Sequence, residues 1–216
     1  MKKPNILTSN QHQSIIGGLL GDLTAQLNGI HCRLTFDHSA EQLEYVRWKH
    51  NILKPYMAGE VKVTARTDNR TGKINMKAIA RTLTLPDFNY YYELFYCYSQ
   101  TEDKIVKKVP TNIGDLLTSE LALAIWYLDD GARRTDCSGL RLHTNDFTYK
   151  EVLLLQSALL QNYQIKSKPN KQGKKKNGEL SYNLAIGATE NQSAKFCDII
   201  RPIVASEIPS MLYKLL

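Results

Sequence analysis

The 216-residue chain has no run of about 18 apolar residues, the length that a helix needs to cross a membrane. It has only four cysteines, and no two of them form a CxxC pair. Because disulfide frameworks and zinc sites need grouped cysteines, isolated ones favour buried thiols in a reducing compartment. The first residues, MKKPNILTSN, lack the apolar core of a signal peptide. We therefore expect an intracellular protein with no membrane partner.

Acidic residues are also few relative to basic ones. Lys and Arg number 28 against 21 for Asp and Glu, so the formal net charge is +7. A positive surface favours a polyanionic partner, and nucleic acid is a stronger candidate than a membrane surface. A chain of this length can bury one large core or two small ones.

The sequence does contain an apolar segment that occurs twice. Ile15–Asp22 (IIGGLLGD) and Leu121–Gly131 (LALAIWYLDDG) both carry an aspartate at the end of a run of apolar and small residues. Asp22 and Asp130 lie 108 residues apart (130 − 22), and an Arg-Leu pair recurs at the same spacing. Such a repeat predicts two helices packed side by side, with both carboxylates at one end. Carboxylate and carbonyl oxygens there would suit a hard cation such as Mg²⁺.

These segments resemble the LAGLIDADG motif of homing endonucleases. The second copy closes with Asp129-Asp130-Gly131, and the first copy has Asp22 at the position of the motif's final acid. Residues 208–215 (IPSMLYKL) resemble the tail of the single-chain branch of the family, which carries two motifs. The resemblance covers most of the chain.

The resemblance implies an α+β fold of two pseudo-symmetric αββαββα halves. Their antiparallel sheets would form a saddle that lies on DNA, with the motif helices at the central interface. We expect an N-terminal half at residues 1–106, a linker at 107–120 and a C-terminal half at 121–216. The residue pattern further predicts a first helix capped at Ser9-Asn10 and an aromatic-rich helix from Pro86 to about Ser99.

The resemblance also gives the two acids a role. Asp22 and Asp130 would hold the metal that assists phosphodiester hydrolysis, and the backbone carbonyls of Gly21 and Asp129 would complete the metal shell. We expect Mg²⁺ as the cofactor, Mn²⁺ as an active substitute and Ca²⁺ as a non-catalytic one.

Basic residues near the metal should offset phosphate charge. Lys214 matches the family's tail motif, and its counterpart in the first half is Lys107 or Lys108. Lys107 follows its acid by 85 residues (107 − 22) and Lys214 follows its own by 84 (214 − 130), which slightly favours Lys107. Surface lysines that flank a turn are the alternative interpretation of this pattern.

Two basic runs, at residues 60–77 and 164–178, fall at the tips of predicted hairpins in corresponding positions of the two halves. Such runs are often only solvated loops. However, two-stranded ribbons fit the major groove of DNA, where Arg, Lys and Asn reach phosphates and base edges. The candidate DNA contacts on these hairpins and strands are Arg33, Lys62, Arg66, Arg70, Lys73, Arg81, Arg141, Lys166, Lys168, Lys171, Lys174, Lys175, Lys176 and Asn183.

The sequence thus predicts a monomeric, site-specific endonuclease that cuts both strands of a long asymmetric DNA target and promotes intron homing. By family analogy its compartment is a mitochondrion or chloroplast. Two alternatives remain: a maturase whose partner is intron RNA, and a DNA-binding relative that no longer cleaves. Retention of both Asp22 and Asp130 argues against loss of the nuclease, because a pure binder does not need two buried acids.

Overall fold

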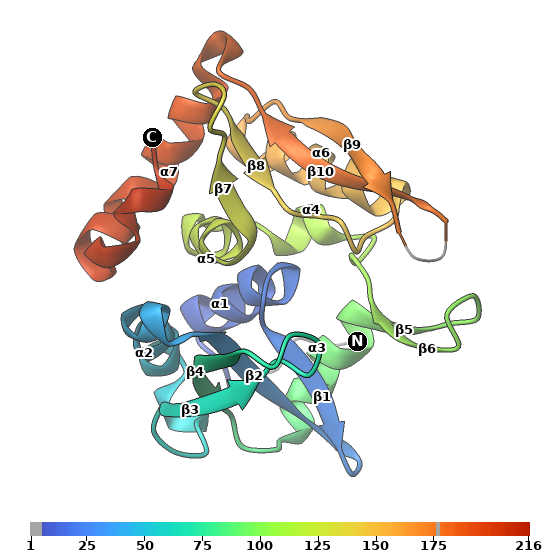
Figure 1. Ribbon diagram of the computed structural model, residues 1–216, viewed down its shortest axis with the longest axis vertical. Helices are drawn as coiled ribbons and strands as arrows, with labels where there is room; N and C mark the ends of the chain where they lie inside the picture. The colour runs from blue at the N-terminus through green and yellow to red at the C-terminus, as the bar shows by residue number, and fades with distance from the viewer. Residues whose placement is uncertain (1–5, 176–177) are drawn as a thin grey trace.

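The computed structural model describes residues 6–175 and 178–216. In Figure 1 two halves of similar design lie on either side of a central pair of helices. The first half contains α1 (Ser9–Leu20), β1 (Thr24–Asn28), β2 (His31–Ser39), α2 (Leu43–Ile52), β3 (Lys62–Thr67), β4 (Ile74–Arg81) and α3 (Asn89–Phe95). The second contains α5 (Glu120–Asp130), β7 (Gly131–Arg133), β8 (Leu140–Leu142), α6 (Tyr149–Tyr163), β9 (Lys168–Lys174), β10 (Leu180–Ile186) and α7 (Gln192–Glu207). Both halves follow the predicted order αββαββα.

Each half contains one four-stranded antiparallel sheet, and the two sheets have the same topology. The strand orders are β1-β2-β4-β3 and β7-β8-β10-β9. The tight β1–β2 turn needs a left-handed residue, which Gly29 provides with φ +67°. Apolar residues alternate along β2, so one face of the sheet packs against the helices and the other faces outward. The predicted pair of antiparallel sheets is confirmed.

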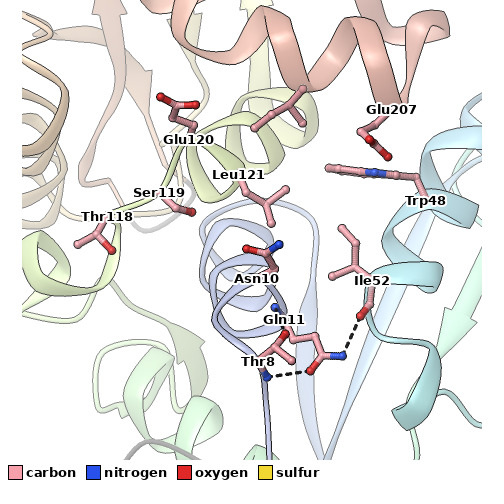
Figure 2. A pocket seen from close by; sticks show the side chains of 11 residues that line it. Thr8, Asn10, Gln11, Trp48, Ile52, Thr118, Ser119, Glu120, Leu121 and Glu207 are labelled. Carbon is pink, nitrogen blue, oxygen red and sulfur yellow. Dashed lines mark hydrogen bonds between the residues drawn. The ribbon is translucent and has the colours of Figure 1, made fainter.

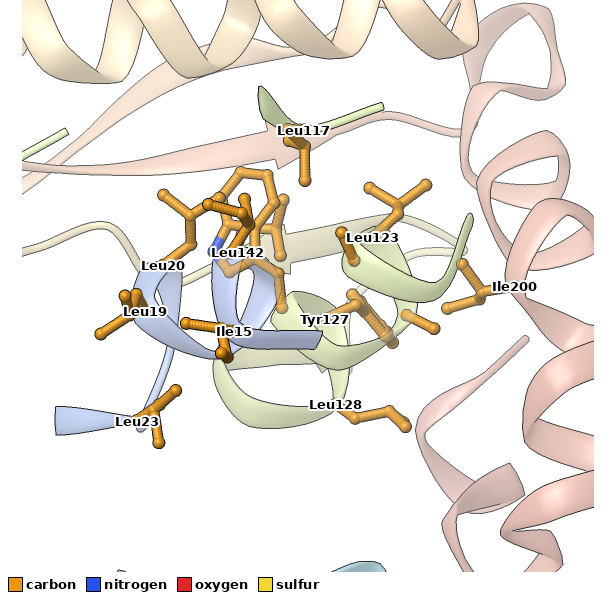
Figure 3. Packing of buried hydrophobic residues seen from close by; sticks show 14 of the residues in the cluster. Ile15, Leu19, Leu20, Leu23, Leu117, Leu123, Tyr127, Leu128, Leu142 and Ile200 are labelled. Atoms are coloured by element: carbon orange, nitrogen blue, oxygen red, sulfur yellow. The ribbon is translucent and has the colours of Figure 1, made fainter. Parts of the chain in front are cut away.

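The motif helices α1 and α5 pack against each other along the centre of the molecule. A Cβ atom at Gly17 would lie only 2.3 Å from the carbonyl oxygen of Ala122, so glycine is what lets the two backbones approach this closely. Figure 3 shows the apolar side chains around this seam, including Ile15 and Leu19 from α1 and Leu123 from α5. All three are fully buried, so one core joins the two halves.

Some predicted boundaries are wrong. Thr8, not Ser9-Asn10, caps α1: its side chain accepts the Gln11 amide at 3.3 Å, and the Gln11 side chain accepts the Thr8 amide at 2.9 Å. The aromatic-rich helix ends at Phe95 rather than Ser99. The chain becomes extended at Tyr96, whose hydroxyl then accepts the Ala25 amide of β1 at 3.0 Å.

Three elements connect the halves. They are β5 (Tyr96–Ser99) and β6 (Lys104–Lys107), which form a two-stranded sheet, and α4 (Ile113–Leu116), which packs against α6. The short 3₁₀ helix η5 (Pro209–Lys214) follows α7 and ends at a predicted site residue. Within residues 6–175 and 178–216, no helix has the length and apolar character to cross a bilayer.

Candidate active site

The two motif acids lie at the same end of the α1–α5 seam. Asp130 is the last residue of α5, and Asp22 directly follows Gly21, the C-cap residue of α1. Burial, followed by the charges of Asp22 and Asp129, raises the pKa of Asp130 to about 7. Burial and the charge of Asp129 also raise the pKa of Asp22, whose side chain is 46% exposed. A cation placed between such carboxylates would relieve this repulsion, so the acids fit a divalent metal.

Lys107, at the end of β6, reaches the C-terminal end of α1. Its Nζ donates to the carbonyl oxygens of Gly21 at 2.7 Å and Leu23 at 3.0 Å. Burial lowers the pKa of the Lys107 ammonium, while the nearby acids act in the opposite direction. The backbone amide of Lys108 bonds instead to the carbonyl of Phe95 at 2.7 Å. Of the two candidate lysines, Lys107 thus has an ammonium that contacts the end of a motif helix.

Lys214, at the end of η5, makes the equivalent contacts in the other half. Its Nζ donates to the carbonyl oxygens of Leu128 at 2.6 Å and Gly131 at 3.2 Å, and lies 3.5 Å from that of Asp129. Burial lowers the pKa of Lys214 as well. Each motif helix thus ends against one half-buried lysine.

The two carbonyls predicted as metal ligands lie at these same helix ends. The carbonyl oxygen of Gly21 accepts one hydrogen bond from Lys107, which leaves a second lone pair. The Asp129 side chain is 0% exposed although the residue as a whole is partly exposed, so its exposed area belongs to the main chain. Main-chain atoms of Asp129 are therefore accessible at this end of α5.

The carboxylate of Asp129 is occupied by other partners. Its Oδ1 accepts the Tyr45 hydroxyl at 2.6 Å and the Lys49 ammonium at 2.8 Å, and its Oδ2 accepts the Asp22 amide at 3.1 Å. Burial acts to raise the pKa of Asp129, but the charge of Lys49 and the hydrogen bonds from Lys49 and Tyr45 hold this pKa below its usual value. Asp129 therefore remains ionised.

A second group of possible ligand atoms comes from Asp22, His38 and Asp129, which lie within 4.8 Å of one another. Lys49 Nζ already lies 2.6 Å from His38 Nε2 and 2.8 Å from Asp129 Oδ1. Because this ammonium occupies the position that a cation would take between the two groups, we do not assign a metal to them. Burial and the Lys49 charge lower the pKa of His38 to about 4, so its ring is neutral.

Cavity volume alone does not locate this site. A cavity of about 750 Å³, shown in Figure 2, lies at the N-terminal ends of α1 and α5 and contacts none of the predicted site residues. Trp48, Leu121 and Ile203 are among the apolar residues that line it. A much smaller cavity of about 100 Å³ contacts Lys107 and Asp130, at the opposite ends of these helices.

Most predicted DNA contacts of the first half share one surface. The antiparallel register places Arg81 opposite Thr35, and Lys62 opposite Ile79, on the face of the sheet that points away from the helices. On this face Arg66 forms an ion pair with Asp37 at 2.9 Å. Arg33 also lies there, and Arg70 and Lys73 are exposed in the β3–β4 turn.

The predicted contacts of the second half are more scattered. Arg141 and Lys168 both pair with Ala185, so they lie in one row on the outer face of the sheet. Asn183 is on the same face but only 1% exposed, so its amide does not reach the surface. Lys171 pairs with Tyr182, whose ring packs on Tyr149 of α6, and therefore lies on the helix side.

The remaining lysines of the second run differ in their surroundings. Lys174 is exposed near the hairpin tip, Lys166 forms an ion pair with Glu190, and Lys175 donates to the carbonyl oxygen of Asp146 at 2.8 Å. Lys176 lies outside the described residues.

Two equivalent arginines on the outer faces have an unsatisfied polar atom. The Nε atoms of Arg33 and Arg141 are buried, and in the described part of the chain they have no hydrogen-bond partner. Buried donors are normally paired, so these two atoms are exceptions among the described residues.

The sequence analysis missed Lys49, Tyr45 and His38. A signal was present, because Lys49 lies three residues after Val46 and four before Leu53, both fully buried. A lysine within the apolar stripe of an amphipathic helix indicates a buried partner or a function. His38 likewise follows Phe36 on the buried face of β2.

The LAGLIDADG DNA endonuclease family matches residues 12–196 of the chain. DNA endonuclease I-ChuI of Chlamydomonas applanata is 32% identical over 215 residues, which cover 96% of this chain and 95% of that protein. Cytochrome b mRNA maturase bI2 of Saccharomyces cerevisiae is 30% identical over 97% of this chain, which spans about half (48%) of the maturase.

A solved structure agrees with the fold. The homing endonuclease I-WcaI bound to its DNA recognition sequence has a TM-score of 0.79 and 22% identity, covering 97% of this chain and 87% of that one. The shared fold and the match over residues 12–196 lead to one assignment. The chain belongs to the LAGLIDADG DNA endonuclease family.

Proposed function

We propose that this chain is a site-specific homing endonuclease that hydrolyses both strands of a long, asymmetric DNA duplex with a divalent metal. The observation that carries the proposal is the meeting of two carboxylates and two half-buried lysines at one end of the α1–α5 seam. Family membership and the similarity to DNA endonuclease I-ChuI support this activity.

Asp22 and Asp130 would hold the metal, together with the main-chain carbonyls of Gly21 and Asp129. These are hard oxygen donors, which suit Mg²⁺ or, as an active substitute, Mn²⁺; Ca²⁺ would bind without supporting cleavage. When bound, the cation would supply Lewis-acid stabilisation of the charge that develops at the scissile phosphate. Because burial and the neighbouring acids raise the pKa of Asp130 to about 7, the cation would compete with a proton for this carboxylate near neutral pH.

The two lysines would act directly on the substrate. An ammonium has three N–H donors, and Lys107 directs two of them to the carbonyls of Gly21 and Leu23. These bonds fix the ammonium and leave a third donor for a phosphate oxygen or the attacking water. Lys214 would place its charge in the same way in the other half, where its ammonium donates to the carbonyls of Leu128 and Gly131 and lies 3.5 Å from that of Asp129. Both charges would offset the negative charge of the substrate.

The outer faces of the two sheets would bind the duplex. Arg33 and Arg141 occupy equivalent positions on them, and their partly exposed guanidinium groups would suit phosphate or base acceptors. Because the two faces carry different residues around these arginines, the target would lack strict palindromy. One chain supplies both faces, so we propose that a monomer binds the whole site.

A second function has support from the relatives. Similarity to cytochrome b mRNA maturase bI2 favours a role with intron RNA, and the same basic faces suit either nucleic acid. We also propose, on the same analogy, that the protein works in a mitochondrion or chloroplast.

Incubating the purified protein with a randomised duplex library and Mg²⁺, then sequencing the new ends, tests the proposal. We expect discrete cuts in a target longer than about 14 base pairs, because two saddles side by side span more than one turn of about 10 base pairs. Gel filtration should show a monomer near 24.6 kDa. Tight binding of a folded intron RNA, with no cut in any duplex, would instead favour the maturase.

A further inference from the structure

A fully buried ion pair lies beside the proposed metal site. The side chains of Lys49 on α2 and Asp129 on α5 are each 0% exposed, and Lys49 Nζ lies 2.8 Å from Asp129 Oδ1. Removing two charges from water carries a large desolvation cost, and apolar residues of similar volume are often at least as stabilising as a buried pair. Stability alone therefore does not explain why this pair is present.

The bonds of Asp129 connect the pair to the backbone of the first catalytic acid. Asp129 Oδ2 accepts the Asp22 amide at 3.1 Å, while Oδ1 accepts the Tyr45 hydroxyl at 2.6 Å. Tyr45 and Lys49 belong to the first half of the chain and Asp129 to the second. A side chain of α5 is thus fixed by α2, and in turn it fixes the residue that follows α1.

His38 connects the same cluster to the side chain of Asp22. Lys49 Nζ donates to His38 Nε2 at 2.6 Å, so this nitrogen carries no proton and Nδ1 does. Nδ1 lies 3.2 Å from Gln42 Oε1 and 3.5 Å from Asp22 Oδ2. The Nδ1–H group thus pairs with Gln42 and lies beside the Asp22 carboxylate, while Lys49 holds the other nitrogen of the ring.

Gly21 provides the space that this arrangement needs. A Cβ atom at Gly21 would lie 2.5 Å from the Cβ of Asp129 and 2.9 Å from its Oδ2. Gly21 and Asp129 each directly precede their motif acid, and Gly21 has no side chain to offer the other half. The cluster therefore supports Asp22, whereas Gly21 offers no equivalent carboxylate to support Asp130.

We propose that His38, Tyr45 and Lys49 are positioning residues that act through Asp129 to hold Asp22 in the orientation needed for metal binding and cleavage. This inference rests on the proposed endonuclease function. Partners of metal ligands typically contribute about 10- to 100-fold to metal affinity or activity, and we expect an effect of this size here. Binding of the duplex without metal should change little, because the cluster is buried.

The first test compares two variants that each lose one buried hydroxyl. Tyr45→Phe removes a bond to Asp129, while Tyr91→Phe removes the bond to His12 Nδ1 at 2.7 Å, in another part of the first half. We expect Tyr45→Phe to raise the Mg²⁺ concentration for half-maximal cleavage at least about tenfold, with an unchanged Kd for DNA. Tyr91→Phe should leave that concentration unchanged. Equal Mg²⁺ dependence in the two variants, with comparable Tm values, would overturn the proposal.

The second test separates positioning from folding. Lys49→Met/Asp129→Leu removes both charges, whereas Lys49→Met/Asp129→Asn keeps an acceptor oxygen for the Asp22 amide. Both double variants should fold, because neither leaves a buried charge unpaired. The rate of cleavage should be lower in the Leu variant by about tenfold or more, and partly recovered in the Asn variant.

A third measurement does not depend on catalysis. Hydrogen exchange at the Asp22 amide, followed by NMR in metal-free protein, should be about five- to tenfold faster in the Leu variant than in the Asn variant, since one hydrogen bond is lost. Equal exchange and equal cleavage in both would refute the positioning role. If the wild-type protein cuts no duplex, only the endonuclease proposal is refuted. The exchange rate still shows whether Asp129 holds the backbone of Asp22.

Discussion

The two motif helices end in equivalent acids but differ in the residue just before each acid. At this position α1 has Gly21, whereas α5 has Asp129, whose carboxylate is fully buried among residues of the opposite half. The lysines at the helix ends are arranged alike, since Lys107 and Lys214 each donate to main-chain carbonyls there. In this molecule the groups proposed for chemistry occur twice, and the groups that support them do not.

The largest effect should come from the acids, because each half contributes one of the two carboxylates that would hold the metal. Replacing either Asp22 or Asp130 with Asn should lower the rate of double-strand cleavage by about a thousandfold or more, since neutral amides hold a divalent cation poorly. DNA binding without metal should stay the same or tighten, because a negative charge beside phosphate is removed. Full cleavage by either variant would show that the halves differ in chemistry as well as in support.

The seam between the helices allows a sharper comparison of two adjacent glycines. A Cβ at Gly17 would meet the backbone of Ala122 at 2.3 Å, while a Cβ at Gly18 would meet only the side chain of Leu23, at 3.0 Å. Both changes to Ala raise helix propensity equally. We expect Gly17→Ala to lower the free energy of unfolding by about 1–3 kcal/mol relative to Gly18→Ala. Urea unfolding measures the difference, and equal stabilities would mean that the seam can open at no cost.

The lysines test whether the halves are equivalent beyond the acids. Lys107→Met and Lys214→Met should each slow cleavage by about 10- to 100-fold at saturating DNA, because each removes a donor aimed at the reaction centre. Lys108→Met is the matched control and should retain the wild-type rate. If either Lys107→Met or Lys214→Met cut only one strand of the duplex, this would show that each half acts on one strand. A slow Lys108→Met enzyme would contradict the assignment of Lys107.

The fold and the meeting of the two motif acids could be predicted because both are encoded locally and then repeated. A helix that ends in an acid is visible in one window, and its second copy fixes the pairing of Asp22 with Asp130. Lys107 was favoured over Lys108 only because the offsets from the acids nearly agree in the two halves. The predicted limits of the halves and linker remain a prediction.

The supporting cluster could not be predicted from one window. Lys49 and Asp129 are 80 residues apart in sequence, so the apolar stripe around Lys49 can indicate that it is buried but cannot identify its partner. The side of the second sheet on which Lys171 lies could not be predicted either. A register shift at Ser181/Tyr182 interrupts the alternation of β10 against β9, so the lysine run does not reveal which residues face outward.

The smallest expected effect concerns these lysines and uses Lys168 and Lys171 as a matched pair. Lys168 lies in one row with Arg141 on the outer face, and Lys171 pairs with Tyr182 on the helix side. If the outer face contacts phosphates, Lys168→Gln should reduce the slope of log K against log salt by about 0.9, because one fewer counterion is released. Lys171→Gln should leave the slope unchanged. The slope is obtained by measuring the affinity for a duplex over a series of salt concentrations. Lys168→Gln should weaken binding to unrelated duplexes by the same factor, because phosphate contacts do not read bases. Equal slopes for the two variants would mean that the second sheet binds DNA through its tip rather than its face, unlike the first.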